Sequence, residues 1–311
     1  MKKRVLITVF ARVRTEVLLL AVLLSVGLLS SGCTKALEDA FNISKVEFVV
    51  RKVIDSGVPD NVNSYENEFS TGIFVHETGT IPVSGIWGTP VVKNMFFRNS
   101  GGVLDGDKLY FDKQKEYDIY SYAPYTGDNK INGESIQFEH EADVIWAKAR
   151  YSNRTQGSVI NKIQLDYEHL TSKVKFIFED SRDPMLKDLH DFNRKSFSIS
   201  GFCKKFYLNV YTGKLTRGPV DPSVIISEEN NPVCFAPKSG EAEYNLEIEI
   251  PATFPLNLPP VIIREKFNYN FRPGYSYVIT INVMTADMSV NSHIVSWEYK
   301  VVEDLEIETK Y

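Results

Sequence analysis

The segment Lys162–Phe178 reads KIQLDYEHLTSKVKFIF and decides the fold class. Its apolar residues fall at every second position in two runs, Ile163, Leu165, Tyr167 and then Val174, Phe176, Phe178. A period of two places the residues of each run on one face of a β-strand. The polar interruption at 169–173 predicts a bulge or a bend between two strands.

Most of the chain on either side has the same character. Short segments rich in Val, Ile, Tyr and Phe recur at roughly ten-residue spacing and are separated by turn residues. They are residues 43–54, 70–76, 89–98, 108–111, 116–123 and 144–149 before the central segment, and 196–200, 206–211, 223–226, 244–250, 261–267 and 275–283 after it. Many short strands with few helices predict an all-β fold of antiparallel sandwiches.

A polar stretch, YSNRTQGS at 151–158, is the predicted boundary between two domains. The chain of 311 residues is long enough for two. We therefore predict an N-terminal β-sandwich at 42–157 and a C-terminal β-sandwich at 158–311. Residues 33–41 form a short tether before them.

The N-terminus has the three parts of a secretion signal. A basic leader at 1–16 precedes the apolar run VLLLAVLLSVGLL at 17–29, and Ser30-Ser31-Gly32-Cys33 follows. Thirteen residues are too few to cross a hydrocarbon core about 30 Å thick, so the run is typical of a signal peptide. The end resembles the bacterial lipobox, with Ser30 in the usual Leu position.

The lipobox predicts that residues 1–32 are removed and that Cys33 carries the lipid. The alternative is an ordinary signal followed by an incidental cysteine. Acyl chains on Cys33 would anchor the protein stably to a membrane, which we expect to be the outer membrane.

Charge and the remaining cysteines exclude some functions. The net charge of the whole chain is −5, and loss of the signal leaves 30 basic and 39 acidic residues. Nucleic acid is therefore not an expected partner, because phosphate binding needs a basic face. Export permits a Cys203–Cys234 disulfide, with two buried free thiols as the alternative. Two thiols alone indicate neither a metal nor a nucleophile.

No pattern of an enzyme stands out, and we expect no catalytic residue, metal or cofactor. The five histidines are scattered, at positions 76, 140, 169, 190 and 293, without a metal-binding spacing. There is no Gly-x-Ser-x-Gly elbow and no phosphate loop. Asp105-Gly106-Asp107 lacks the other oxygen ligands of a calcium loop and predicts a hairpin turn. Sequence leaves open a carboxylate pair at glycosidase separation.

The chain resembles the fimbrillin superfamily of Bacteroidales in an ordered set of segments. They are IYSYAPY at 119–125, DVIWA at 143–147, IQLDYEHLTSKVKFIF at 163–178, FYLNVYTGKL at 206–215, FRPGYSYVITINV at 271–283 and HIVSWEY at 293–299. The resemblance covers nearly all of the chain after the signal. It implies two tandem transthyretin-like β-sandwich domains and a role as a pilus component.

In fimbrillins a protease that cuts after Arg removes the lipidated N-terminal piece and the first strand. A neighbouring subunit then fills the cavity with a strand of its own, which is β-augmentation. The resemblance makes 43–50 the candidate for the lost strand and Arg51 the residue before the cut. The alternative interpretation is that Arg51 is an exposed residue of an edge strand.

The C-terminal tail is the candidate donor strand. Its apolar residues again alternate, at Val295, Trp297, Tyr299, Val301, Leu305 and Ile307. This pattern predicts one extended strand with its apolar side chains on one face. The alternative is two ordinary edge strands with a turn near Glu303-Asp304.

We therefore expect a structural or adhesive component of a donor-strand-assembled, type V-like pilus, exported as a lipoprotein to the outer membrane and cell surface. Its partners would be other pilus subunits, of the same or a different kind. The alternative is a surface lipoprotein that binds glycans by stacking exposed aromatic residues on sugar rings. Its candidate residues are Trp87, Tyr120, Tyr122 and Trp146, which a sandwich core would equally explain.

Overall fold

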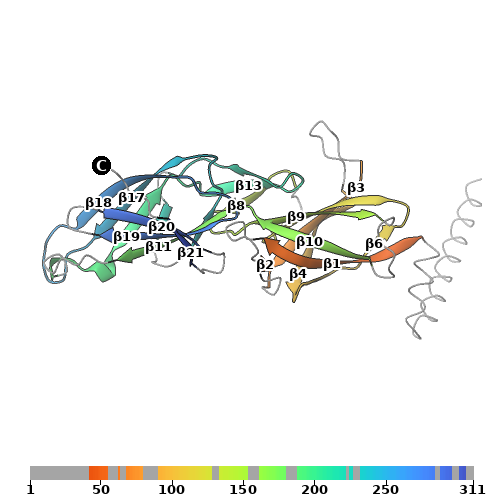
Figure 1. The fold of residues 1–311 in the computed structure, drawn as a ribbon, viewed down its shortest axis with the longest axis horizontal. Helices are drawn as coiled ribbons and strands as arrows, with labels where there is room; N and C mark the ends of the chain where they lie inside the picture. The colour runs from red at the N-terminus through yellow and green to blue at the C-terminus, as the bar shows by residue number, and fades with distance from the viewer. Residues whose placement is uncertain are drawn as a thin grey trace, which may run out of the picture.

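Figure 1 shows the computed structural model of the protein, an elongated molecule built of β-strands. The structure describes residues 42–54, 62–63, 68–79, 90–127, 133–152, 161–179, 188–221, 224–226, 232–283, 288–295 and 301–305. A short 3₁₀ turn, η2 (Phe192–Arg194), lies among the strands. The predicted all-β fold class is confirmed.

Nine strands form the N-terminal sheet. They are β1 (Ile43–Ile54), β2 (Val62–Asn63), β3 (Ser70–Glu77), β4 (Val92–Ser100), β5 (Val103–Gly106), β6 (Leu109–Asp112), β7 (Glu116–Ala123), β9 (Ile145–Ser152) and β10 (Asn161–His169). Neighbours are antiparallel along the path β10–β9–β7–β3–β4–β5–β1. Strand β1 then pairs with β10 in parallel. This last pairing closes the sheet into a barrel-like arrangement, which we call the closed sheet.

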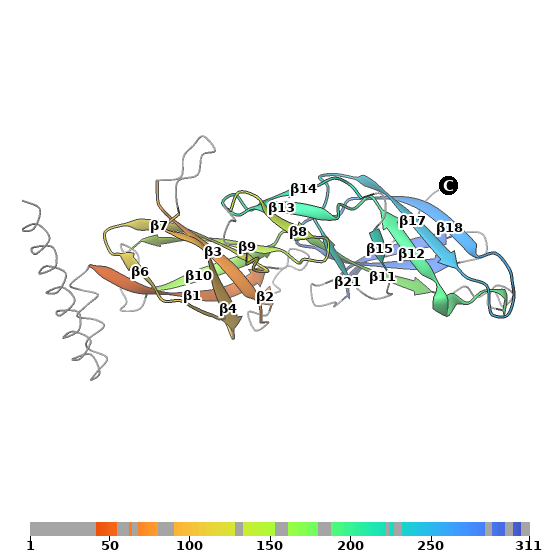
Figure 2. The same ribbon diagram turned by 180° about the vertical axis from the view of Figure 1, so that it is seen from behind.

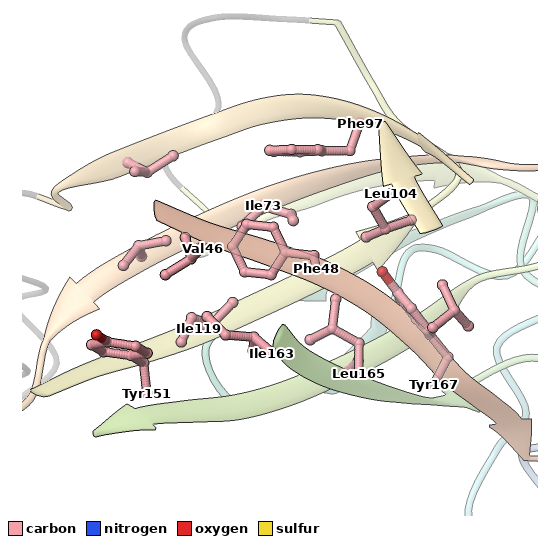
Figure 3. Close-up of a cluster of buried hydrophobic side chains, with 14 of the residues drawn as sticks. Val46, Phe48, Ile73, Phe97, Leu104, Ile119, Tyr151, Ile163, Leu165 and Tyr167 are labelled. Atoms are coloured by element: carbon pink, nitrogen blue, oxygen red, sulfur yellow. The ribbon is translucent and has the colours of Figure 1, made fainter. Parts of the chain in front are cut away.

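The interior of the closed sheet is filled by the alternate residues of its strands. Figure 3 shows Val46 and Phe48 of β1 facing Ile73, Ile119, Ile163 and Leu165 from the other strands. Burial of every second residue explains the period of two in the sequence, since the intervening side chains point outward.

The C-terminal part has two sheets that share one core. The first, in the order β16–β11–β19–β20–β21, contains β11 (Ser172–Glu179), β16 (Val233–Phe235), β19 (Ser276–Val283), β20 (Met288–Val295) and β21 (Val301–Leu305). The second, in the order β15–β12–β17–β18, contains β12 (Ser196–Ser200), β15 (Val224–Ile226), β17 (Ala242–Ile250) and β18 (Val261–Tyr269). Phe176 and Ile279 of the first sheet belong to the same buried cluster as Phe197 and Ile248 of the second.

A third, small sheet joins the two parts of the molecule, as the reverse view in Figure 2 shows. It pairs β8 (Ile136–Glu139), which precedes β9 in the chain, with β13 (Lys205–Asn209), and β14 (Lys214–Arg217) follows. Its side chains bury Phe74 and Tyr120, which point outward from β3 and β7 of the closed sheet. The two parts are therefore connected by a common apolar core, which we call the joining core.

The predicted boundary at 157/158 lies between β9 and β10, outside the described residues. Strand β10 belongs to the closed sheet, and the chain enters the C-terminal sheets between His169 and Ser172. The polar stretch at 151–158 precedes β10, and β10 pairs antiparallel with β9. The stretch therefore connects neighbouring strands of one sheet. The predicted interruption at 169–173 is present as the break between β10 and β11 at Leu170 and Thr171.

Candidate functional site

Strand β1 is the seam of the closed sheet. One edge of β1 pairs with β10 from Val46↔Asn161 to Ile54↔Glu168. The other edge pairs with β6, β5 and β2 in turn. Strands β10 and β5 keep their other neighbours β9 and β4 without β1, whereas β2 and β6 pair with β1 alone among the described strands. Removing β1 would therefore open a slot with unpaired backbone on β10 and on the strands opposite.

The slot is apolar on its inner side because β1 supplies part of the core. Val46, Phe48 and Val50 are at most 5% exposed, and Val53 is 9% exposed. The Phe48 ring meets the Phe97 ring edge-on, with 5.4 Å between ring centroids. Each such side chain contributes about 1.5–3 kcal/mol by burial, so an empty slot favours any strand with matching apolar residues.

A β-bulge interrupts β1 at Arg51. Val50 pairs with Leu165 and Lys52 pairs with Asp166, so Arg51 is the extra residue between two successive pairs. Buried residues of β1 are two positions apart up to Val50, but Val53, the next one, is three positions further on. This change of spacing in ISKVEFVVRKVI is the sequence signal for the bulge, and a search for strict alternation does not detect it.

Arg51 points outward at the bulge and forms an ion pair with Asp166 of β10. Its guanidinium Nε donates to Asp166 Oδ1 at 2.7 Å, and a second guanidinium nitrogen contacts Oδ2. The hydrogen bond and the positive charge of Arg51 hold the pKa of the Asp166 carboxyl below its ordinary value. The Arg51 side chain is 54% exposed, so its guanidinium faces solvent while β1 is paired.

One wall of the slot, β10, is tied to the closed sheet by bonds that do not involve β1. The Ser121 hydroxyl of β7 lies 2.7 Å from that of Thr71 on β3 and 2.6 Å from that of Tyr167 on β10. Burial raises the pKa of Tyr167 to about 12, so its hydroxyl stays neutral and can donate. These bonds cross the interior and tie β10 to the rest of the closed sheet.

The predicted lipidation site lies outside the described residues, since the structure describes the chain from residue 42 onward. The Cys33 prediction is therefore not tested. No helix within the described ranges has the length and the apolar character needed to cross a membrane.

The C-terminal tail is folded back on its own sheet. Val295 ends β20 and pairs with Val301 of β21, and the two strands are antiparallel. Glu303 and Asp304 lie within β21 and pair with Ile294 and His293, so the turn predicted near them is absent from this described strand. Trp297, Tyr299 and Ile307 lie outside the described residues, while Leu305 ends β21. Strand β21 is at the end of its sheet, with β20 as its neighbour.

Two of the four aromatic residues proposed for glycan stacking are buried. Tyr120 and Tyr122 are 2% and 0% exposed and belong to the joining core, so stacking on a sugar is wrong for both. Trp146 is half-buried and donates its indole N–H to the Val210 carbonyl at 2.6 Å. Trp87 lies outside the described residues. The interpretation as core residues is confirmed for the two tyrosines.

The cysteines and His169 have contacts that fit a role in packing. Cys203 and Cys234 are buried free thiols, so the structure has the second of the two predicted alternatives. His169 places Nδ1 2.9 Å from Asp143 Oδ1 where β10 ends. Within the described part of the chain, no three His, Cys, Asp or Glu side chains gather as a metal site would require.

Comparison with known proteins identifies the family. The sequence profile of the Fimbrillin-like family matches residues 62–297, and the chain belongs to this family. No curated protein matches the chain. A putative cell adhesion protein from Bacteroides uniformis has a similar structure, with a TM-score of 0.54 and 16% identity over 82% of this chain and 98% of that one. A putative cell adhesion protein from Bacteroides ovatus has a TM-score of 0.55 and 14% identity, over 84% of this chain and 99% of that one. At such identities the likeness shows the fold.

Proposed function

We propose that this chain is a structural or adhesive pilus subunit without enzymatic activity, exported as a lipoprotein through Cys33 and assembled at the outer membrane by strand exchange. In the proposed order of events, β1 is cut after Arg51 and its residues 43–51 leave with the lipidated segment. A strand from a neighbouring subunit, of the same or another kind, then fills the slot. The candidate for that strand is the C-terminal tail from Val295 to Ile307.

One observation carries the proposal. The strand nearest the N-terminal signal is also the strand that closes the sheet, with apolar residues inward and an exposed Arg at a bulge. A cut at that position would separate the anchored segment from the folded body. The cut body would have an apolar slot, which is unstable until a strand enters it.

Family and fold support the same assignment. Fimbrillin-like membership agrees with a pilus role, and the two similar structures carry the description of putative cell adhesion proteins. The position of β21 at the end of its sheet also agrees with a strand that can leave. Release of β21 would remove pairing from one side of β20.

The N-terminal residue of the assembled protein tests the proposal. We expect polymers purified from the cell surface to begin at Lys52, because the cut releases everything before it. Edman sequencing or terminal-peptide mass spectrometry would read this residue directly, with the unassembled precursor as the control beginning at Cys33. A lipidated Cys33 in the assembled form would exclude removal of β1.

A further inference from the structure

The bulge at Arg51 divides β1 into two unequal pieces. The long piece, 43–51, supplies Val46, Phe48 and Val50 to the core. The short piece, 52–54, supplies Val53. A cut after Arg51 falls between them, so it frees the long piece and leaves the short one attached to the folded body.

The short piece is held on both of its edges. Lys52, Val53 and Ile54 pair with Asp166, Tyr167 and Glu168 of β10. On the other edge Val53 and Ile54 pair with β2. Its pairing therefore does not depend on the long piece, and Val53 can keep its place in the core after the cut.

Asp166 lies beside both residues of the bond to be cut. Its carboxylate binds the Arg51 guanidinium, and the Lys52 ammonium Nζ lies 4.0 Å from Oδ2. Hydrolysis adds one water across the Arg51–Lys52 amide. Arg51 departs with the new carboxylate, and Lys52 gains an α-ammonium, which is protonated below a pKa of roughly 8. Asp166 thus loses the Arg51 guanidinium as a cationic partner and gains the new α-ammonium of Lys52, the residue with which it pairs.

We propose that Asp166 is a positioning residue for strand exchange: it fixes Arg51 at the bulge before the cut and holds the new N-terminus of Lys52 afterwards. The inference rests on the proposed function. Its consequence is that residues 52–54 form an end stop for the slot. The incoming strand then fills only the positions of 43–51, where inward residues alternate with a period of two and no bulge is needed.

The test compares three variants of the full chain made in cells and solubilised in detergent. Asp166→Asn removes the carboxylate, Asp166→Glu keeps the charge, and Glu168→Gln removes a carboxylate two positions along the same exposed face of β10. Each protein is cut with an arginine-specific endoprotease and then exposed to an aminopeptidase. Mass spectrometry follows the loss of Lys52, Val53 and Ile54 from the new N-terminus.

We expect wild type, Asp166→Glu and Glu168→Gln to keep Lys52, and Asp166→Asn to lose the three residues several-fold faster. Initial cutting at Arg51 should also be a few-fold faster in Asp166→Asn, since exposed ion pairs have modest effects. Equal trimming of Asp166→Asn and Glu168→Gln would overturn the inference while leaving removal of β1 intact. Absence of cutting at Arg51 in every variant would overturn both the inference and the proposed function.

Discussion

Phe48→Ala is expected to lower the free energy of unfolding of the uncut chain by about 3–5 kcal/mol. Phe48 is 2% exposed, and its ring packs edge-on against Phe97 across the closed sheet. Truncation removes the transfer free energy of the ring and leaves a cavity that the surrounding strands cannot fill. Denaturant unfolding followed by intrinsic fluorescence would measure the loss.

Val49→Ala is the matched control for Phe48→Ala. Val49 is the next residue of β1 and pairs with Val103 of β5. Its side chain is half-buried and lies on the opposite face of the strand from Phe48. Its truncation should cost less than about 1 kcal/mol. The proposed assembled form gives a second comparison, because Phe48 would have left with residues 43–51 and a strand from the neighbour would take its place. Equal destabilisation by both substitutions would contradict the account of β1 as the inner seam.

Phe206→Ala is expected to have a similar effect, about 3–5 kcal/mol, by opening the joining core. The Phe206 ring is fully buried and stacks on Phe138 of β8, with 5.9 Å between centroids. Since this core connects the two parts, we expect a single calorimetric transition in wild type and two separated transitions in the variant.

The control for the joining core is Tyr207→Ala on the opposite face of β13. Tyr207 is half-buried and follows Phe206 directly, so its side chain points away from the joining core. It should keep one transition with a small change in midpoint. Two transitions already in wild type would show that the parts unfold independently and that the joining core is weaker than its burial indicates.

Sequence periodicity predicted the strands well because burial on one face dictates the period. It placed β10 and β11 and the interruption between them, since Ile163 and Phe176 belong to separate alternating runs. It does not distinguish a polar connection between neighbouring strands from a domain linker, because the two have the same composition. Which strands pair depends on contacts between distant residues, and the parallel pairing of β1 with β10 leaves no local pattern.

The sequence names single candidate residues but not their contacts. An Arg after an apolar run marks Arg51, whereas its bulge and its partner Asp166 require the register of two strands that are distant in sequence. For the aromatic residues of β7, the sequence gives the face of the strand but not what covers that face. Tyr120 and Tyr122 lie on one face that an isolated sheet would expose, and the third sheet covers that face.

The direct passage from β10 to β11 has a mechanical consequence. Both strands run close to the long axis of the molecule, and only Leu170 and Thr171 separate them (Figure 1). A tensile force on a strand bound beside β10 would reach β11 and its parallel neighbour β19 without stretching a slack linker. Pulling along paired strands strains all of their hydrogen bonds in shear at once. If the chain assembles by strand exchange as proposed, its filament should therefore resist a pull along its axis far better than a force that peels the strands apart.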